Sequence, residues 1–180
     1  MNKEEYIEMF SEIAGNLWDN MMSDGSTDIP VEIVYTENYN GGDENKKLVY
    51  EKTGDSGFDL RAETNESGGY QIAPQGTIVI PCGIKVAVPQ GTELQVRTRS
   101  GSPLKKGFVV ANSPGTVDSG YRGVVGVICH NISDDVIDIE CGERIAQGVI
   151  CPVYRANFIE CEELDETDRG DGAYNSTGVR

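Results

Sequence analysis

From residue 28 to residue 154 the chain runs in short segments rich in β-branched and aliphatic residues, and Gly, Pro, Asn or Asp punctuates them. The clearest segments are residues 30–36, 47–52, 76–91, 93–98, 108–112, 123–131, 135–143 and 144–154. Short strands at fairly regular spacing, with turn residues between them and no helical crossovers, favour a sandwich or a barrel. We therefore predict an all-β, jelly-roll-like barrel.

The two ends of the chain have different patterns. In residues 3–22, large apolar side chains recur at spacings of three and four, which predicts an amphipathic helix: Tyr6, Phe10, Ile13, Leu17 and Met21. We expect this helix to cap the domain's own core or to line a subunit contact, and the alternative is that it docks a protein partner. The last residues are acidic, then rich in Gly, Ser, Thr and Asn, which is typical of a flexible tail. The predicted boundaries are a helical extension over residues 1–27, a barrel over 28–164 and a flexible arm over 165–180.

Charge is distributed unevenly along the chain. The 180 residues fit one domain with a real core and carry a net charge of −15. Residues 85–130 hold six Lys or Arg against two Asp or Glu, so this middle part has a net charge of +4 (6 − 2). Nucleic-acid binding needs an extended basic stripe and is therefore disfavoured. A mononucleotide, which a few cationic groups and a metal ion can neutralise, suits this small basic region better.

The five cysteines form no closely spaced pair, and an odd number cannot close into a complete set of disulfides within one chain. We interpret them as reduced thiols of a cytoplasmic protein, mostly buried as small apolar side chains. The first thirty residues contain neither a basic leader nor a long apolar run, and no later stretch approaches the roughly 18 apolar residues of a membrane span. The sequence therefore predicts no membrane association.

Five segments, in order along the chain, resemble the five motifs of the trimeric all-β dUTP diphosphatases, the dUTPases: residues 56–62, 99–107, 112–123, 142–150 and 169–178. The resemblance implies a homotrimer that hydrolyses dUTP to dUMP and diphosphate with Mg²⁺. Such an enzyme keeps uracil out of DNA and supplies dUMP for thymidylate synthesis, in a bacterial cell or a phage-infected host. Residues 1–27 lie outside the resemblance, and residues 35–55 are longer than the usual first loop.

The resemblance can be compared with the chemistry of single residues. Asp118 lies in a Gly-flanked turn that would present its carboxylate into a cleft, and the resemblance assigns it to activating the attacking water. Gln147 lies in an apolar strand, where a buried amide needs a hydrogen-bond partner, and its family counterpart helps to hold that water. Asp59 is a hard oxygen ligand suited to Mg²⁺, and the resemblance implies contact through metal-bound water.

The substrate contacts fall into three groups. Gly101 lets the backbone approach a ligand closely, and the residues similar to Arg99 and Ser100 bind phosphates in the family. The 112–121 hairpin offers backbone donors and acceptors to uracil, with Asn112, Gly115 and Val117 as binding residues and Tyr121 packed against deoxyribose so that a 2′-hydroxyl is excluded. In the arm, the resemblance implies nucleotide contacts from Arg169, Tyr174, Ser176, Thr177 and Gly178. There Ala173 and Asn175 replace two glycines of the usual motif.

Two other functions remain as alternatives. The related dCTP deaminases need a glutamate on the strand after the third motif, and the matching position here is Ile128, so deamination is disfavoured. The other alternative is a regulatory module of the dUTPase fold that uses residues 1–27 and the long 35–55 region to bind a protein. The residues at 59, 118, 147 and 169 argue against an inactive enzyme.

Overall fold

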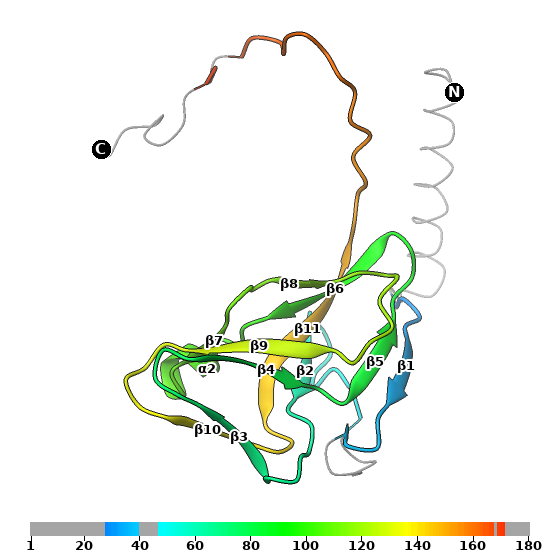
Figure 1. Cartoon of the computed structure of the whole chain (residues 1–180). Coiled ribbons are helices and arrows are strands. Elements are labelled where there is room, and N and C mark those ends of the chain that lie inside the picture. The colour runs from blue at the N-terminus through cyan, green and yellow to red at the C-terminus, as the bar shows by residue number, and fades with distance from the viewer. Residues whose placement is uncertain (1–27, 40–46, 168, 172–180) are drawn as a thin grey trace.

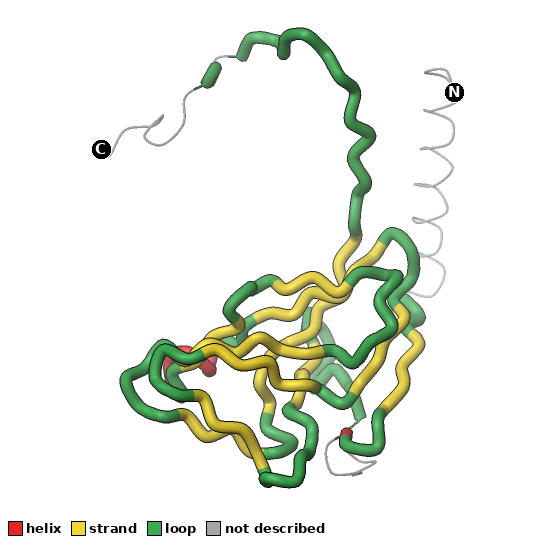
Figure 2. Tube along the Cα trace, in the orientation of Figure 1, coloured by secondary structure: helices red, strands yellow, loops and turns green. Residues whose placement is uncertain are grey.

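A computed structural model of the chain is all-β, as predicted, and describes residues 28–39, 47–167 and 169–171 (Figure 1). The strands are β1 (Glu32–Tyr35), β2 (Phe58–Arg61), β3 (Gly69–Ile72), β4 (Thr77–Pro81), β5 (Ile84–Ala87), β6 (Thr92–Arg97), β7 (Phe108–Val110), β8 (Gly115–Val117), β9 (Gly126–Asn131), β10 (Ile137–Glu140) and β11 (Arg144–Pro152). A short helix, α2 (Gly101–Lys105), joins β6 to β7. Figure 2 shows that strands and loops make up nearly all of the described chain.

The strands form antiparallel sheets that enclose one core. The largest sheet has the order β2-β11-β6-β8, and the others are β4-β9-β7, β1-β5 and β10-β3. In the largest sheet, Gln147 of β11 lies opposite Asp59 of β2 on one side and Arg97 of β6 on the other. This register places two segments that are far apart in sequence, residues 56–61 and 144–150, side by side at the candidate active site.

Burial alternates along the strands as a half-buried sheet requires. In β9, Val127, Cys129 and Asn131 point inward and alternate with less buried residues. Two of the five cysteines, Cys82 and Cys129, belong to the core, so the prediction that most are buried was only partly right. Burial raises the pKa of the Cys129 thiol to about 12 and that of Cys82 further still, which keeps both thiols protonated.

Asn131 is a fully buried polar residue that fixes the turn after β9. Its Nδ2 atom donates to the carbonyl oxygens of Ile72, Ala73 and Asp135 at 3.0, 3.1 and 2.7 Å. Its Oδ1 atom accepts from the backbone N–H and the hydroxyl of Ser133, both at 2.8 Å. The side chain thus satisfies its own polar atoms and ties β3 to the 131–135 turn.

The sequence-based prediction was wrong at several short elements. Residues 47–52 are not a strand. The Leu48 N–H donates to the Tyr35 hydroxyl at 3.1 Å and the Lys52 N–H to the Asp55 carboxylate at 2.9 Å, so these amides bond to side chains and not to a neighbouring strand. Strands β2, β3 and β8 were missed because they hold only one or two apolar residues each and lie outside the longer apolar runs. Helix α2 was also missed. It contains Pro103, which a helix tolerates because the residue lies in its first turn. The helix predicted within residues 1–27 lies outside the described residues, and no helix in the described part is long and apolar enough to cross a membrane.

Candidate active site

A carboxylate on β2 holds two arginines from other parts of the chain. Asp59 accepts from Nε of Arg99 at 2.8 Å through Oδ1, and from Nη1 of Arg144 at 3.3 Å through Oδ2. Its side chain is 9% exposed, whereas those of Arg99 and Arg144 are 26% and 46% exposed. Charge-assisted hydrogen bonds of this kind are strong and directional, so Asp59 fixes where both guanidinium groups lie.

These arginines belong to a cationic pocket of about 530 Å³, which is lined by Arg99, Ser100, Gly101, Ser102, Lys105, Lys106, Phe108, Glu143, Arg144 and Gln147. Four of the lining side chains are cationic and one is acidic. The acidic one, Glu143, is paired with Nζ of Lys106 at 2.7 Å. The pocket therefore has a net positive charge and suits an anion such as a phosphate chain.

The floor of the cationic pocket is open to a ligand. A Cβ atom built on Gly101 would meet nothing within 4 Å, so the packing of the protein itself does not require glycine there. Gln147 is half-buried, and its side-chain amide has no hydrogen-bond partner among the described residues. An amide and an unobstructed backbone segment thus face the same space as the arginines.

A second concavity, the hairpin pocket, has a volume of about 230 Å³. It is lined by Val96, Asn112, Gly115, Thr116, Val117, Asp118, Tyr121, Val125, Gly126 and Ile128. Strand β8 pairs with β6 so that Gly115 lies opposite Val96 and Val117 opposite Leu94. A Cβ atom at Gly115 would come within 2.9 Å of Nδ2 of Asn112, so glycine is required for the amide to rest on the strand.

Hydroxyl groups tie the two pockets to the end of β6. The Thr98 N–H donates to Oγ of Ser113 at 3.1 Å, and Oγ1 of Thr98 accepts from the Val110 N–H at 2.9 Å. These bonds fix the chain entering Arg99 against the chain entering the hairpin. The hairpin and the arginine are therefore held by one small network.

The turn after β8 is braced from within. The Tyr121 ring lies over Gly123, where a Cβ atom would clash with the phenol, and its hydroxyl donates to the Val124 carbonyl at 3.1 Å. Nη1 of Arg122 donates to the carbonyls of Ser119 and Tyr121 at 2.8 and 2.7 Å. Arg122 thereby restrains the turn that carries Asp118.

Asp118 lies at the mouth of the hairpin pocket and is exposed. Within the described residues its carboxylate accepts no hydrogen bond and forms no ion pair, in contrast to Asp59. It is also the one carboxylate among the residues that line this pocket. Position 128, where a dCTP deaminase would need a glutamate, is an isoleucine that lines the same pocket. A carboxylate that the fold does not use is available to take a proton from water.

Comparison with known proteins agrees with this geometry. Residues 43–178 match the dUTPase family model. A deoxyuridine 5′-triphosphate nucleotidohydrolase of Helicobacter pylori (strain Shi470) is 50% identical over 130 residues, which cover 72% of this chain and 87% of that protein. The chain belongs to the dUTPase family. The corresponding protein of Roseobacter denitrificans is 47% identical over 130 residues, covering 72% of this chain and 85% of the relative.

Solved structures of dUTPases share the fold. A dUTPase variant of Staphylococcus bacteriophage 80alpha with dUpNHpp superposes with a TM-score of 0.70 over 86% of this chain and 100% of that chain, at 24% identity. The dUTPase of phage phi11 of S. aureus has a TM-score of 0.63, at 21% identity, over 77% of this chain and 99% of that chain. These likenesses confirm the jelly-roll-like dUTPase barrel.

The structure divides the predicted dUTPase site residues into three groups. Arg99, Ser100, Gly101 and Gln147 line the cationic pocket, and Asp59 lies against it. Asn112, Gly115, Val117, Asp118 and Tyr121 line the hairpin pocket, which shares no described lining residue with the first. Arg169 belongs to the segment after β11, and Figure 1 shows this segment leaving the barrel, while Tyr174, Ser176, Thr177 and Gly178 lie outside the described residues.

Sequence reasoning missed two arginines. Arg144 lies within a motif segment, but its pairing with Asp59 depends on the register of β2 against β11. Arg122 follows Tyr121 directly, and its contacts are to backbone carbonyls, which leave no pattern in the sequence. In the part of the chain that the structure describes, no group of three His, Cys, Asp or Glu side chains comes together as a metal cage.

Proposed function

We propose that the protein hydrolyses dUTP to dUMP and diphosphate. The observation that carries this proposal is a carboxylate without a hydrogen-bond partner among the described residues, Asp118, in a braced turn of a molecule that also presents a four-cation pocket. The relatives named deoxyuridine 5′-triphosphate nucleotidohydrolase support the same reaction. The product pair requires cleavage of the anhydride bond between the α- and β-phosphates.

In the proposed reaction, Asp118 removes a proton from a water molecule that attacks phosphorus. The Gln147 amide holds that water by a hydrogen bond. Arg99 and Arg144 stabilise the negative charge that develops on the leaving diphosphate as the anhydride P–O bond breaks. The backbone at Ser100 and Gly101 binds the same chain. A base of this kind typically contributes about 10² to 10⁴ in rate.

Selectivity is proposed to reside in the hairpin pocket. Asn112 and the backbone of Gly115 and Val117 pair with the edge of uracil, and the wrong base would leave buried polar groups unpaired. The Tyr121 ring, held by its hydroxyl bond to Val124, occupies the space that a 2′-hydroxyl would need. The pocket offers one carboxylate, at Asp118, and Ile128 where a deaminase would need its glutamate, so hydrolysis is preferred to deamination.

Mg²⁺ is the proposed metal, and the donor set fits an ion that arrives with the nucleotide. Mg²⁺ keeps several waters and is commonly bound by one or two carboxylates plus substrate phosphates. Asp59 would contact it through water, since each carboxylate oxygen retains a second lone pair beside its guanidinium bond. When bound, the ion would neutralise charge on the phosphate oxygens.

A homotrimer is proposed because the resemblance to the trimeric dUTPases implies one. The two pockets of one chain share no described lining residue, so a second copy could bring its hairpin pocket to a cationic pocket. The test is complementation. Asp118→Asn and Arg99→Ala chains, each inactive alone, are unfolded together and refolded as a mixture, which should regain activity because some sites combine the intact turn of one chain with the intact pocket of another. A mixture as inactive as its components would mean that each chain carries a whole site.

The arm, residues 165–180, is proposed to complete the site with Arg169, Tyr174, Ser176, Thr177 and Gly178.

We place the enzyme in the cytoplasm of a bacterium or an infected host cell, where it would limit uracil in DNA and supply dUMP. The proposed 1–27 and 28–164 boundaries are those predicted from the sequence.

The decisive experiment is a substrate comparison. The purified protein with Mg²⁺ is incubated separately with dUTP, UTP, dTTP and dCTP, and diphosphate and the base of the product are assayed. Diphosphate should be released far faster from dUTP than from the others, with uracil unchanged. Comparable rates on all four nucleotides would refute the assignment of the hairpin pocket, and uracil formed from dCTP would favour a deaminase.

A further inference from the structure

An apolar groove opens into the core on the side of the barrel formed by β1 and β5. We name it the core groove; it has a volume of about 260 Å³ and is lined by Ile29, Val31, Ile33, Tyr35, Leu48, Val49, Tyr50, Phe58, Val86, Val88, Leu94 and Ile150. Its floor consists of core residues such as Leu94 and Val86. Its lip is exposed: Ile29, Val49 and Tyr50 are 48%, 59% and 52% accessible to solvent.

The core groove calls for an apolar occupant. All of its lining side chains are aliphatic or aromatic, and the hydroxyl of Tyr35 is already engaged by the Leu48 N–H. A continuous apolar surface of this kind, in a chain with a net charge of −15, is typical of a binding surface rather than of scattered surface residues. Covering its lip would remove apolar surface from water and would therefore be favourable.

The chain itself supplies a matching segment next to the groove. Ile29, at the lip, is the second residue that the structure describes, so residues 1–27 join the barrel there. At 100° per residue, the stripe of Tyr6, Phe10, Ile13, Leu17 and Met21 falls on one helix face, and Glu4, Glu8, Glu12 and Asp19 fall on the other. Residues 23–27 are a short, Gly-containing connection that allows the chain to reverse direction.

We propose that residues 3–22 form an amphipathic helix that docks its apolar face into the core groove of the same chain. The proposal is independent of the catalytic assignment. The stripe lies before residue 43, where the match to the dUTPase family model begins.

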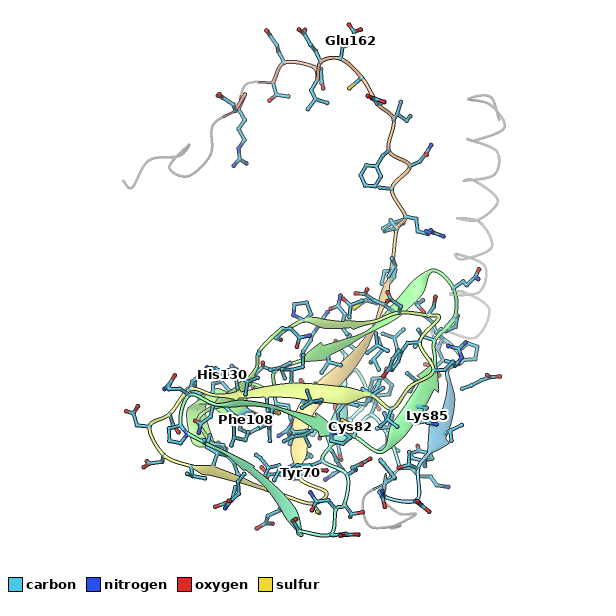
Figure 3. All side chains as sticks on the ribbon, viewed as in Figure 1. Tyr70, Cys82, Lys85, Phe108, His130 and Glu162 are labelled. Atoms are coloured by element: carbon cyan, nitrogen blue, oxygen red, sulfur yellow. The ribbon has the colours of Figure 1, made fainter. Side chains whose placement is uncertain are left out.

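The exposed apolar residues after β11 fit the groove less well. Tyr154, Phe158, Ile159 and Leu164 are each more than 80% exposed, but they lie on an extended segment that leads away from the barrel (Figure 3). In an extended chain neighbouring side chains point to opposite sides, so Phe158 and Ile159 cannot enter one groove together. The N-terminal stripe presents its five side chains on one face.

Cross-linking of the full chain tests the docking directly. Leu17→Cys is combined with Val49→Cys in a background where Cys141, Cys151 and Cys161 are serine, and a mild oxidant is added; Cys82 and Cys129 remain because they are buried. A disulfide should form within one chain, at the mass of a single chain on a non-reducing gel. The matched control replaces Leu17→Cys by Asp19→Cys, on the opposite helix face, and should cross-link much more slowly. Equal rates for the two pairs, no cross-link, or a product that joins two chains would overturn the proposal.

A stability measurement provides a second, independent readout. Phe10→Asp should lower the thermal midpoint of the full chain by at least about 2–4 °C, because a charge would enter an apolar contact. Ser11→Asp adds the same charge at the next position on the polar face and should leave the midpoint unchanged. If Phe10→Asp behaves like Ser11→Asp, the stripe does not pack on the barrel and the proposal fails.

Discussion

Asp59→Asn should separate two roles that the Asp59 carboxylate can have. The aspartate bonds the guanidinium group of Arg99 at 2.8 Å and that of Arg144 at 3.3 Å. Asparagine keeps one acceptor oxygen, so the shorter contact would persist as a weaker, uncharged hydrogen bond. The longer contact would be lost, because the amide NH₂ would face another donor.

The magnitude follows from these contacts. A hydrogen bond to a charged group contributes about 1.5–3 kcal/mol, and the partial exposure of both arginines reduces this. About 1–2 kcal/mol remains, and this is the most that misplaced arginines should cost in binding, so the affinity for the triphosphate should fall by about 5- to 30-fold. The loss should appear in the binding of a non-hydrolysable dUTP analogue measured by calorimetry in EDTA, where no metal contributes.

A metal-contact role would be visible in a different measurement. If Asp59 also contacts Mg²⁺ through water, the variant should need more Mg²⁺ for half-maximal turnover, in addition to its weaker binding in EDTA. The matched control is Asp138→Asn, whose carboxylate lies on β10 and accepts from Gln71 at 2.8 Å, away from both pockets. Unchanged analogue binding in EDTA would refute the claim that Asp59 positions the arginines.

Three further outcomes are expected. Asp118→Asn should fold and bind dUTP but lose about 10² to 10⁴ in kcat, since an amide cannot take the proton from water; near-normal kcat would assign the base to another residue. Truncation after Asp168 should leave the thermal midpoint and oligomeric mass nearly unchanged while abolishing most dUTP hydrolysis, and a fully active truncated protein would exclude the arm from the site. Asn131→Leu should lower the free energy of unfolding by about 3 kcal/mol or more in urea titrations, because several buried backbone groups lose their partner, whereas exposed Asn65→Ala should cost about 1 kcal/mol.

The fold class followed from local pattern, because alternating burial in strands such as β9 leaves a period of two in the sequence. The strand predicted at residues 47–52 failed for a tertiary reason. Its apolar residues Leu48, Val49 and Tyr50 lie in a loop and line the core groove. The segment therefore has the apolar composition of a strand, although its backbone pairs with no strand among the described residues. Strands as short as β8 are set by their neighbour's register, which no local window contains.

The sequence predicted which residues belong to the candidate site, but it did not predict which of them contact one another. Asp59 and Arg99 stand 40 positions apart, and Asp59 and Arg144 stand 85 apart, so their contacts exist only once β2, β11 and β6 are aligned. The bracing by Arg122 depends on two carbonyl directions in one turn. The motifs identified these segments, whereas the structure adds the contacts: Asp59 bonds two arginines, Arg122 bonds two carbonyls, and the Asp118 carboxylate has no hydrogen bond or ion pair among the described residues.

The arrangement of charge gives the cationic pocket an effect beyond its contacts. Three of its cations, Arg99, Lys105 and Lys106, come from the basic middle of the sequence, and Arg144 joins them from the acidic last third. The net charge of −15 repels an anionic nucleotide from most of the surface, so the field favours approach at this pocket. Salt screens exposed charges over about 10 Å at 0.1 M, so added salt should weaken both the repulsion and the attraction. Because the Asp59 contacts are short and partly buried, they should retain the orientation of the arginines at salt concentrations that already slow nucleotide capture.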